Sequence, residues 1–397
     1  MLRKSLALLF VLTLVGAACS TSDDDGGGDT DDSGAASGDP IVIGFPADLT
    51  TDWAYYDSPM QEGAQFAVDQ INDNGGVLGR PLELQTVDMR NDVAEAAKVT
   101  QQLIDDGAVY LIGTVGDGIL AEGQVACGAN IPISTGLGTA PTLVGDMGPC
   151  AYQLVMSDNI QAAVLAEYAV AQGYETAYAL GSNEIPYTEN LPIYFADAFQ
   201  QAGGTVVGSD QYKIGAGDYS AAVTKLANSD PAPDVVFTPM FIPDSLVFLR
   251  QLRQAGLTMP VLSTDGNADA ALLDAGAKAI DGLTFTNSVC TAEGDPGVAG
   301  FYEDYNAEYG NDPSSYVAVI GYDEVNILKA AIEEANSAEP ADIVAALANV
   351  DYTGISGHAV MDPSTRRVDK PASIVQMDGA TFTCLPEPPF PSYVPPA

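Results

Sequence analysis

The amino-acid sequence predicts an α/β protein whose parallel sheets are covered by helices and whose chain is divided into two lobes. Short apolar segments typical of buried strands alternate with amphipathic helical patterns, as in parallel sheets with helices on both faces. This alternation restarts near residue 152, after a first unit has been completed. In addition, about 350 residues follow residue 40, more than one hydrophobic core usually holds.

The first unit combines apolar strand segments with two helical patterns. Within its first helix, apolar residues recur at helical spacing, and a following glycine pair is a stop signal. In chain order, we predict a strand at 41–46, a helix within 58–76, a strand at 81–89, a helix at 93–104, and strands at 108–114 and 131–135.

The second unit repeats this pattern, and the final third departs from it. The predicted strands are 152–157, 176–182, 205–212, 234–239, 259–264 and 282–288, and the helices are 159–172, 191–201, 219–227, 244–255 and a short one from 268. The final third has helical patterns without strands, at 298–309, 315–335 and 341–347. Since such helices need a sheet to cover, we expect them to return to the first unit.

The N-terminal region predicts export and an anchor. Two basic residues precede an apolar run from Leu6 to Ala18, which is shorter than the roughly 20 residues of a membrane-spanning helix and predicts a signal peptide at 1–18. Cys19 then stands where bacterial lipoprotein precursors carry their acylated cysteine, so we expect an extracytoplasmic protein anchored to the cell membrane. Gly16 departs from that motif, and a secreted or periplasmic protein without lipid is the alternative.

Both ends of the folded part are unusual in composition. Residues 19–39 are rich in aspartate and glycine, and we expect a disordered acidic tether because such a segment buries too little apolar surface to fold. Residues 385–397 form a proline-rich tail, expected to be an extended arm.

Charge and composition exclude several functions. With 14 basic and 54 acidic residues the net charge is −40, which opposes binding of nucleic acid phosphates. The loop "GTVGDG" has the outer glycines of a phosphate loop but lacks its lysine. One histidine and no close cysteine pair argue against a metal site and against Ser-His-Asp catalysis. We therefore expect no cofactor, no metal and no enzymatic activity.

Four cysteines follow Cys19 and predict two disulfides in an exported chain. The sequence alone allows three pairings. Cys127 and Cys150 close a short loop and are the expected local pair, which leaves Cys290 with Cys384. Buried free thiols are the alternative.

Several segments, in their order along the chain, resemble substrate-binding proteins of branched-chain amino-acid-type ABC transporters. The most specific is "AVDQINDNGGVLGR", and others are "IGFPADLTTDWAYYD", "IPISTGLGTAPTL" and "STDGN". The resemblance covers residues 41 to about 380. It implies a type I periplasmic-binding fold, with two Rossmann-like lobes joined by three hinge crossovers. We expect an N-terminal lobe at 41–156 plus 287–351 and a C-terminal lobe at 157–286 plus 352–384.

The resemblance also implies ligand-binding residues in the first lobe. Tyr56 falls where the family has an aromatic residue at the cleft mouth, although a packed aromatic is an equal alternative. Asp117 and Gly118 occupy the loop that presents a serine hydroxyl and an amide to a ligand carboxylate. An aspartate there would repel this group, so Asp117 points to solvent or the ligand is not a simple α-amino acid. Gly138 precedes Thr139, which matches a threonine that contacts the carboxylate.

In the second lobe the resemblance implies three further positions. Tyr187 matches a tyrosine of the cleft, and Phe241 falls where another aromatic residue closes on the ligand. Asp265 matches the acidic residue that receives the ligand's ammonium group. An ordinary turn is the alternative for Asp265, since Asp-Gly is common in turns.

The function implied is that of an extracytoplasmic solute-binding lipoprotein. We expect it to capture a small polar ligand, an amino acid or an amide-like molecule, and to deliver it to the permease subunits of an ABC importer. We also expect a monomer that meets the membrane only through its lipid anchor. The alternative is an exported ligand-sensing module for a membrane receptor, since the same lobes serve receptors.

Overall fold

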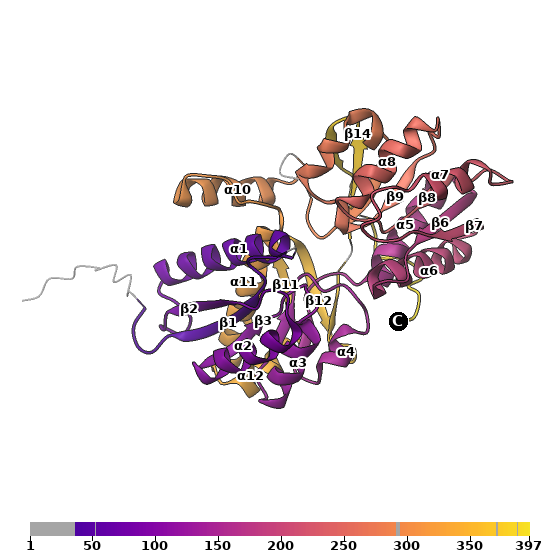
Figure 1. Ribbon diagram of the computed structural model, residues 1–397. Coiled ribbons are helices and arrows are strands. Elements are labelled where there is room, and N and C mark those ends of the chain that lie inside the picture. Colours follow the sequence, from indigo (N-terminus) through magenta and orange to yellow (C-terminus); the bar gives the residue numbers. More distant parts are fainter. Residues whose placement is uncertain (1–35, 52, 291–293, 371, 387) are drawn as a thin grey trace, which may run out of the picture. The chain divides into compact units, whose positions relative to one another are not determined.

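The computed structural model describes residues 36–51, 53–290, 294–370, 372–386 and 388–397 (Figure 1). The predicted signal peptide, Cys19 and most of the acidic tether lie outside these residues. The described residues form two sheets flanked by helices, which confirms the predicted α/β fold with two lobes. Within them, no helix is both long enough and apolar enough to cross a membrane.

The first sheet has eight strands. They are β1 (Ile41–Ala47), β2 (Leu82–Asp88), β3 (Ala108–Ile112), β4 (Ile133–Thr135), β5 (Ala151–Gln153), β11 (Asp351–Gly354), β12 (Gly357–Asp362) and β13 (Arg367–Asp369). Their order is β11-β12-β13-β5-β4-β3-β1-β2. The strands from β5 to β2 are parallel, and β13 joins β5 in parallel, while β12 pairs antiparallel with β11 and β13.

The second sheet has seven strands. They are β6 (Thr176–Gly181), β7 (Thr205–Gln211), β8 (Val235–Phe237), β9 (Val261–Ser263), β10 (Leu283–Asn287), β14 (Ser373–Asp378) and β15 (Thr381–Cys384). Their order is β15-β14-β10-β9-β8-β6-β7. The strands from β10 to β7 are parallel, whereas β14 and β15 are antiparallel additions at the β10 edge.

Helices cover both faces of the first sheet. They are α1 (Ala54–Asp73), α2 (Val93–Asp105), α3 (Ile119–Gly128), α4 (Leu143–Met147), α10 (Pro296–Tyr309), α11 (Val317–Ala335) and α12 (Pro340–Leu347). In β1, Ile41 and Ile43 pack in the same core as α1 and α11, whereas Val42 packs with α2 and α3. This alternation follows from the two-residue period of a strand, and Figure 1 shows the two helix layers.

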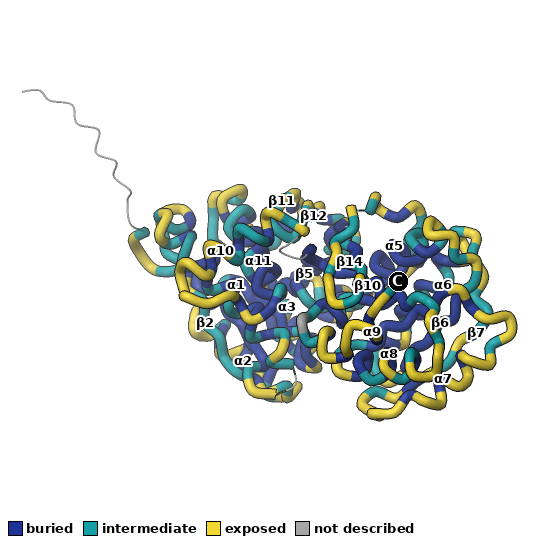
Figure 2. The backbone as a smooth tube through the Cα atoms, turned by 90° about the horizontal axis from the view of Figure 1, so that it is seen from above, coloured by how far each residue is buried: buried dark blue, intermediate teal, exposed yellow. Residues whose placement is uncertain are grey.

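The second sheet is covered in the same way. Its helices are α5 (Asp158–Ala171), α6 (Pro186–Gln201), α7 (Ser220–Ala227), α8 (Asp244–Gln254) and α9 (Ala277–Ile280), with 3₁₀ turns η1 (Asp265–Asn267) and η2 (Ala270–Ala275). Val235 and Phe237 pack with α5 and α6, and Val236 between them packs with α7 and α8. Figure 2 shows buried residues concentrated in the strands and in the helix faces toward them.

Local sequence signals set several helix ends. The Asp92 side chain caps α2 by accepting from the backbone N–H of Glu95 at 2.8 Å, and Asp295 caps α10 by accepting from Gly297 at 2.7 Å. The chain after α1 turns through Gly76, whose φ is 73°. A Cβ atom at this position would lie 2.0 Å from the carbonyl oxygen of Arg80, so only glycine fits this turn.

The last third of the chain corrects two predictions. Its helices α10 to α12 share a core with α1, as predicted, but five strands from β11 to β15 follow them. The sheets are therefore mixed rather than purely parallel. Moreover, β11 to β13 belong to the first sheet, so the predicted return to the second lobe at residue 352 is too early. In these short edge strands exposed residues alternate with half-buried or buried ones, which gives a weak apolar signal in the sequence.

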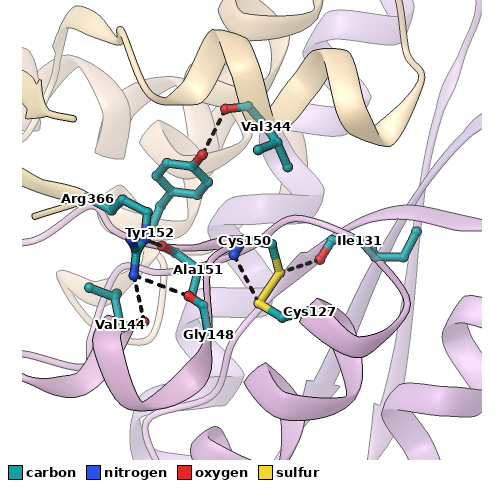
Figure 3. The surroundings of a disulfide bond; sticks show 9 residues. All are labelled: Cys127, Ile131, Val144, Gly148, Cys150, Ala151, Tyr152, Val344 and Arg366. Carbon is teal, nitrogen blue, oxygen red and sulfur yellow. Dashed lines mark hydrogen bonds between the residues drawn. A yellow bond between two sulfur atoms is a disulfide. The ribbon is translucent and has the colours of Figure 1, made fainter. Parts of the chain in front are cut away.

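The chain passes between the two sheets three times, after β5, after β10 and after β13, in agreement with three crossovers. The predicted disulfides are both present, Cys127 with Cys150 and Cys290 with Cys384. The first joins the last turn of α3 to the start of β5 (Figure 3). Beside it, the Arg366 side chain donates to the carbonyl oxygen of Ala151 at 3.1 Å, which ties the β12–β13 turn to β5.

Candidate ligand-binding site

Side chains that suit ligand binding gather at the carboxyl ends of the parallel strands. In each lobe the parallel strands follow the order 2-1-3-4-5, and ligands of such sheets bind beyond these strand ends. The segments after β1, β3, β4, β6, β8 and β9 carry the eight predicted positions, which are Tyr56, Asp117, Gly118, Gly138, Thr139, Tyr187, Phe241 and Asp265.

Asp265 and Tyr187 form the centre of the second-lobe part of this site. The Tyr187 hydroxyl donates to Asp265 Oδ1 at 2.7 Å and accepts from the backbone N–H of Gly266 at 3.3 Å. Its oxygen lies 2.6 Å from Thr264 Oγ1, which must donate because Tyr187 has a single proton. Burial raises the pKa of Asp265, and the hydrogen bond from Tyr187 opposes that shift. The Asp265 carboxyl group is thereby held in one orientation.

Phe241 adds an aromatic face beside this pair. Its ring lies edge-on to the ring of Tyr187, with 6.5 Å between the ring centres and 64° between the planes. A Cβ atom on Gly266 would lie 2.6 Å from Cβ of Phe241, so glycine allows η1 to approach the loop after β8. Asn267 secures this approach by donating to the carbonyl oxygen of Met240 at 2.7 Å.

The first turn of α5 connects Asp265 with the loop after β4. Gln161 Oε1 accepts from Thr286 Oγ1 at 2.7 Å and from the backbone N–H of Asp265 at 3.4 Å. Three residues earlier, the backbone N–H of Asp158 donates to the carbonyl oxygen of Thr139 at 2.9 Å. Burial raises the pKa of Asp158 to about 8; the Thr139 side chain opposes this by hydrogen bonding, and the charge of Asp265 adds to it.

A buried carboxyl group positions the aromatic residues of the first lobe. Asp57 accepts from the backbone N–H of Asp48 at 2.8 Å, from the hydroxyl of Thr114, and from the backbone N–H of Val115 at 3.4 Å. These contacts fix the first turn of α1 to the ends of β1 and β3. Burial raises the pKa of Asp57 to about 7 against these hydrogen bonds. The preceding residue, Tyr56, is held by this anchored turn.

Three tyrosines of the first lobe interact with two carboxyl groups of the second. Burial, and then the charges of Asp265 and Asp269, raise the pKa of Tyr56. Burial, and then the charge of Asp265, also raise the pKa of Tyr316, which packs against the cores of both lobes. Burial and a hydrogen bond to Asp269 raise the pKa of Tyr55. Aromatic and acidic groups of both lobes therefore belong to one cluster.

Asp117 and Gly118 differ in their surroundings in the first lobe. The Asp117 side chain is exposed, and its backbone N–H donates to Asn91 Oδ1 at 3.0 Å. This corresponds to the solvent-facing alternative for Asp117. A Cβ atom on Gly118 would lie 2.6 Å from Cβ of Ala96, so this glycine permits close packing of α3 on α2.

Gly138 supports the loop that carries Thr139. Its backbone N–H donates to Thr135 Oγ1 at 2.7 Å, and its carbonyl oxygen accepts from Gln153 Nε2 at 2.5 Å. A Cβ atom here would lie 2.5 Å from Leu143 Cδ2. The glycine therefore holds the loop against β5 and α4.

The cluster is suited to a small cationic group. Asp265 offers a fixed carboxyl group, and the rings of Tyr187 and Phe241 offer faces and edges that contact an ammonium group or an apolar chain. Among the described residues, no group of three or more His, Cys, Asp and Glu side chains is placed to hold a metal ion.

Sequence reasoning missed five residues of this cluster. They are Tyr55, Asp158, Gln161, Asp269 and Tyr316. Asp158 and Gln161 had a signal in the sequence, because they are polar residues in the first turn of a mostly apolar helix. Tyr316 had none, since no motif of the sequence marks it, and the structure shows it packed against the cores of both lobes.

The chain matches known proteins over most of its length. The family model for periplasmic binding proteins matches residues 40–381. The Leu/Ile/Val-binding protein BraC3 of Rhizobium johnstonii is 28% identical over 306 residues, which are 77% of this chain and 82% of that protein. A Pseudomonas aeruginosa protein that binds leucine, isoleucine, valine, threonine and alanine is 24% identical over 78% of this chain and 83% of its own.

A solved structure agrees with this match. The leucine-binding protein LivK of Thermotoga maritima superimposes with a TM-score of 0.75 at 25% sequence identity, over 87% of this chain and 98% of that protein. The predicted resemblance is thus confirmed, and the family is one of binding proteins rather than enzymes. The family match over 40–381, together with two doubly wound sheets joined by three crossovers, shows that this chain belongs to the periplasmic binding protein family.

Proposed function

We propose that the protein binds an aliphatic amino acid outside the cytoplasm and delivers it to an ABC importer. The observation that carries this proposal is the Asp265 carboxyl group, held by Tyr187 beside the ring of Phe241. A fixed carboxylate in a partly buried site binds an ammonium group more strongly than an exposed one does. The aromatic rings then contact the apolar side chain of the ligand.

The choice of ligand rests on the relatives. BraC3, the Pseudomonas protein and LivK are each named for binding leucine, and two of the three names include isoleucine and valine. Delivery to an importer rests on the resemblance to ABC transporter components. In our proposal, the ligand contacts Asp265 of the second lobe and Tyr56 of the first, and these contacts favour approach of the lobes.

The anchor belongs to the same proposal. The acylated Cys19 would hold the protein at the outer side of the cell membrane, and the acidic tether would keep the folded part away from anionic headgroups. The two disulfides support an oxidising compartment. Mass spectrometry of the mature N-terminus tests this step, because a diacylated Cys19 is expected and an unmodified N-terminus would contradict it.

The ligand proposal is tested by thermal shift with leucine, isoleucine, valine, threonine and alanine on the purified protein. Ligand at 100 times its dissociation constant stabilises by about 2.7 kcal/mol, which shifts the melting temperature by several degrees. N-acetyl-leucine has no ammonium charge and is expected to give no shift. Mass spectrometry of copurified small molecules provides an independent identification.

Two variants assign the effect to Asp265. Asp265→Asn removes the charge with little change in size and is expected to abolish the shift. Asp218→Asn is the matched control, because Asp218 lies in the same lobe and accepts from the backbone N–H of Ser220 at the surface. The ligand proposal fails if none of the five amino acids binds, and the assignment fails if Asp265→Asn binds as the unchanged protein does.

A further inference from the structure

The proline-rich tail packs along α5 and α6. The Tyr393 hydroxyl donates to Asp197 Oδ2 of α6 at 2.6 Å, and the backbone N–H of Ser392 donates to Glu167 Oε1 of α5 at 2.7 Å. Figures 1 and 2 both place the C-terminal end beside these two helices. The tail is therefore an ordered arm, and its contacts extend over two helices of the second lobe.

The end of this arm reaches the first turn of α5. Asn159 Nδ2 donates to the carbonyl oxygen of Pro395 at 2.8 Å, and Asn159 Oδ1 accepts from Ser157 Oγ at 2.6 Å. Asn159 is only 3% exposed, so the tail carbonyl satisfies a buried donor. Val394 also packs against the core cluster that includes Val155 and Ile160, on the two sides of the start of α5.

The same turn of α5 carries residues of the ligand-binding cluster on its other sides. Asp158 contacts Thr139 through its backbone and its side chain. Gln161 accepts from the backbone N–H of Asp265 and from Thr286. Because four consecutive residues share one helical turn, a displacement of Asn159 also displaces Asp158 and Gln161.

We propose that the C-terminal tail positions the ligand-binding residues, with the carbonyl oxygen of Pro395 fixing Asn159 and thereby the turn that holds Thr139 and Asp265. The tail is well suited to this task. Pro396 confines Pro395 to an extended conformation, so little conformational entropy is lost when the arm docks. The role assigned to Asp265 rests on the proposed function, whereas the mechanical connection does not.

Hydrogen exchange of backbone amides in the ligand-free protein tests this connection. Two variants are compared with the unchanged chain, namely Asn159→Asp, which removes the donor to Pro395, and deletion of 393–397. We expect exchange at the amides of Asp158 and Asp265 to become about fivefold faster, the factor that corresponds to loss of one hydrogen bond. The amide of Val236, which donates to the carbonyl oxygen of Pro260 at 3.0 Å, serves as the internal reference.

The controls separate positioning from general stabilisation. Ser392→Ala removes an exposed tail contact with Glu167 and is expected to leave the amides of Asp158 and Asp265 unchanged. The inference is overturned if exchange at Asp265 does not change in the Asn159→Asp variant, or if Val236 accelerates by the same factor. The exchange experiment uses no ligand, so its result can be interpreted even if no amino acid binds. In the same way, a negative exchange result does not affect the thermal-shift test of the proposed function.

Discussion

At the scale of single residues, the Tyr187 hydroxyl determines how Asp265 is presented. It donates to the carboxyl group and also meets Thr264 and Gly266, so all of its hydrogen-bonding capacity is used. Asp265 has a pKa raised by burial, and the donor from Tyr187 keeps that rise smaller. An ionised Asp265 is the form that attracts an ammonium group.

Tyr187→Phe is therefore expected to raise the pKa of Asp265 further, because the opposing hydrogen bond is lost, and to weaken binding of leucine about tenfold. An NMR titration of the carboxyl carbon gives the first quantity and calorimetry the second. Tyr309→Phe is the matched control, because the Tyr309 hydroxyl donates to Asp69 at 2.6 Å in the first lobe. Equal values for Tyr187→Phe and the unchanged protein would contradict the role of this hydroxyl.

At this scale the sequence indicated which residues follow the strands, but not what their side chains contact. Tyr187 contacts both Asp265 and Phe241 in the structure, and the ligand-binding role of these three residues stays a prediction. The Asp117 side chain is exposed, and Gly118 permits α3 to approach α2 closely. A motif gives the residue that follows a strand, whereas the direction of its side chain depends on neighbouring elements.

At the scale of secondary-structure elements, the two disulfides differ in how far apart in the sequence their cysteines lie. Cys127 and Cys150 are 23 residues apart, and Cys290 and Cys384 are 94 residues apart. A crosslink that closes a longer loop restricts the unfolded chain more strongly. The second disulfide also connects β15 at the sheet edge with the crossing after β10.

Replacing a cysteine pair by serines is expected to lower the free energy of unfolding. In the chain-entropy model the loss is about 3 kcal/mol for Cys127 and Cys150 and about 4 to 5 kcal/mol for Cys290 and Cys384. Chemical denaturation of each double variant measures these losses. The reverse ranking would show that native packing, rather than loop length, controls the contribution of these crosslinks.

At the scale of the whole molecule, buried carboxyl groups set the dependence of stability on pH. Burial raises the pKa of Asp57 and of Glu324 to about 7 and that of Asp158 to about 8. In the unfolded chain such groups ionise near 3.8 for aspartate and 4.5 for glutamate. The folded protein therefore binds more protons between these limits, and its free energy of unfolding falls as pH rises from about 4 to about 8.

Glu324→Gln tests this sign. Below pH 4.5 Glu324 is protonated in both the folded and the unfolded protein. As pH rises to about 7, the unfolded chain loses this proton first, and the contribution of Glu324 to the free energy of unfolding is lost. Over that pH range the free energy of unfolding of the glutamine variant is expected to fall by about 2 to 3 kcal/mol less than that of the unchanged protein. Glu333→Gln is the control on the same helix, because Glu333 is exposed and pairs with Lys329. An unchanged slope in the Glu324→Gln variant would contradict this account.

The sequence by itself determined the α/β class and the two units, and its motifs indicated the strand ends that carry the candidate site. These features follow from local periodicity and from the order of motifs, which any stretch of chain carries without its partners. Tertiary structure alone decided the remaining features. It placed β11 to β13 in the first sheet, Tyr316 beside Asp265, and the tail against Asn159. Each of these contacts joins segments far apart in the chain, and only the burial of helix and sheet faces against one another determines which of them meet.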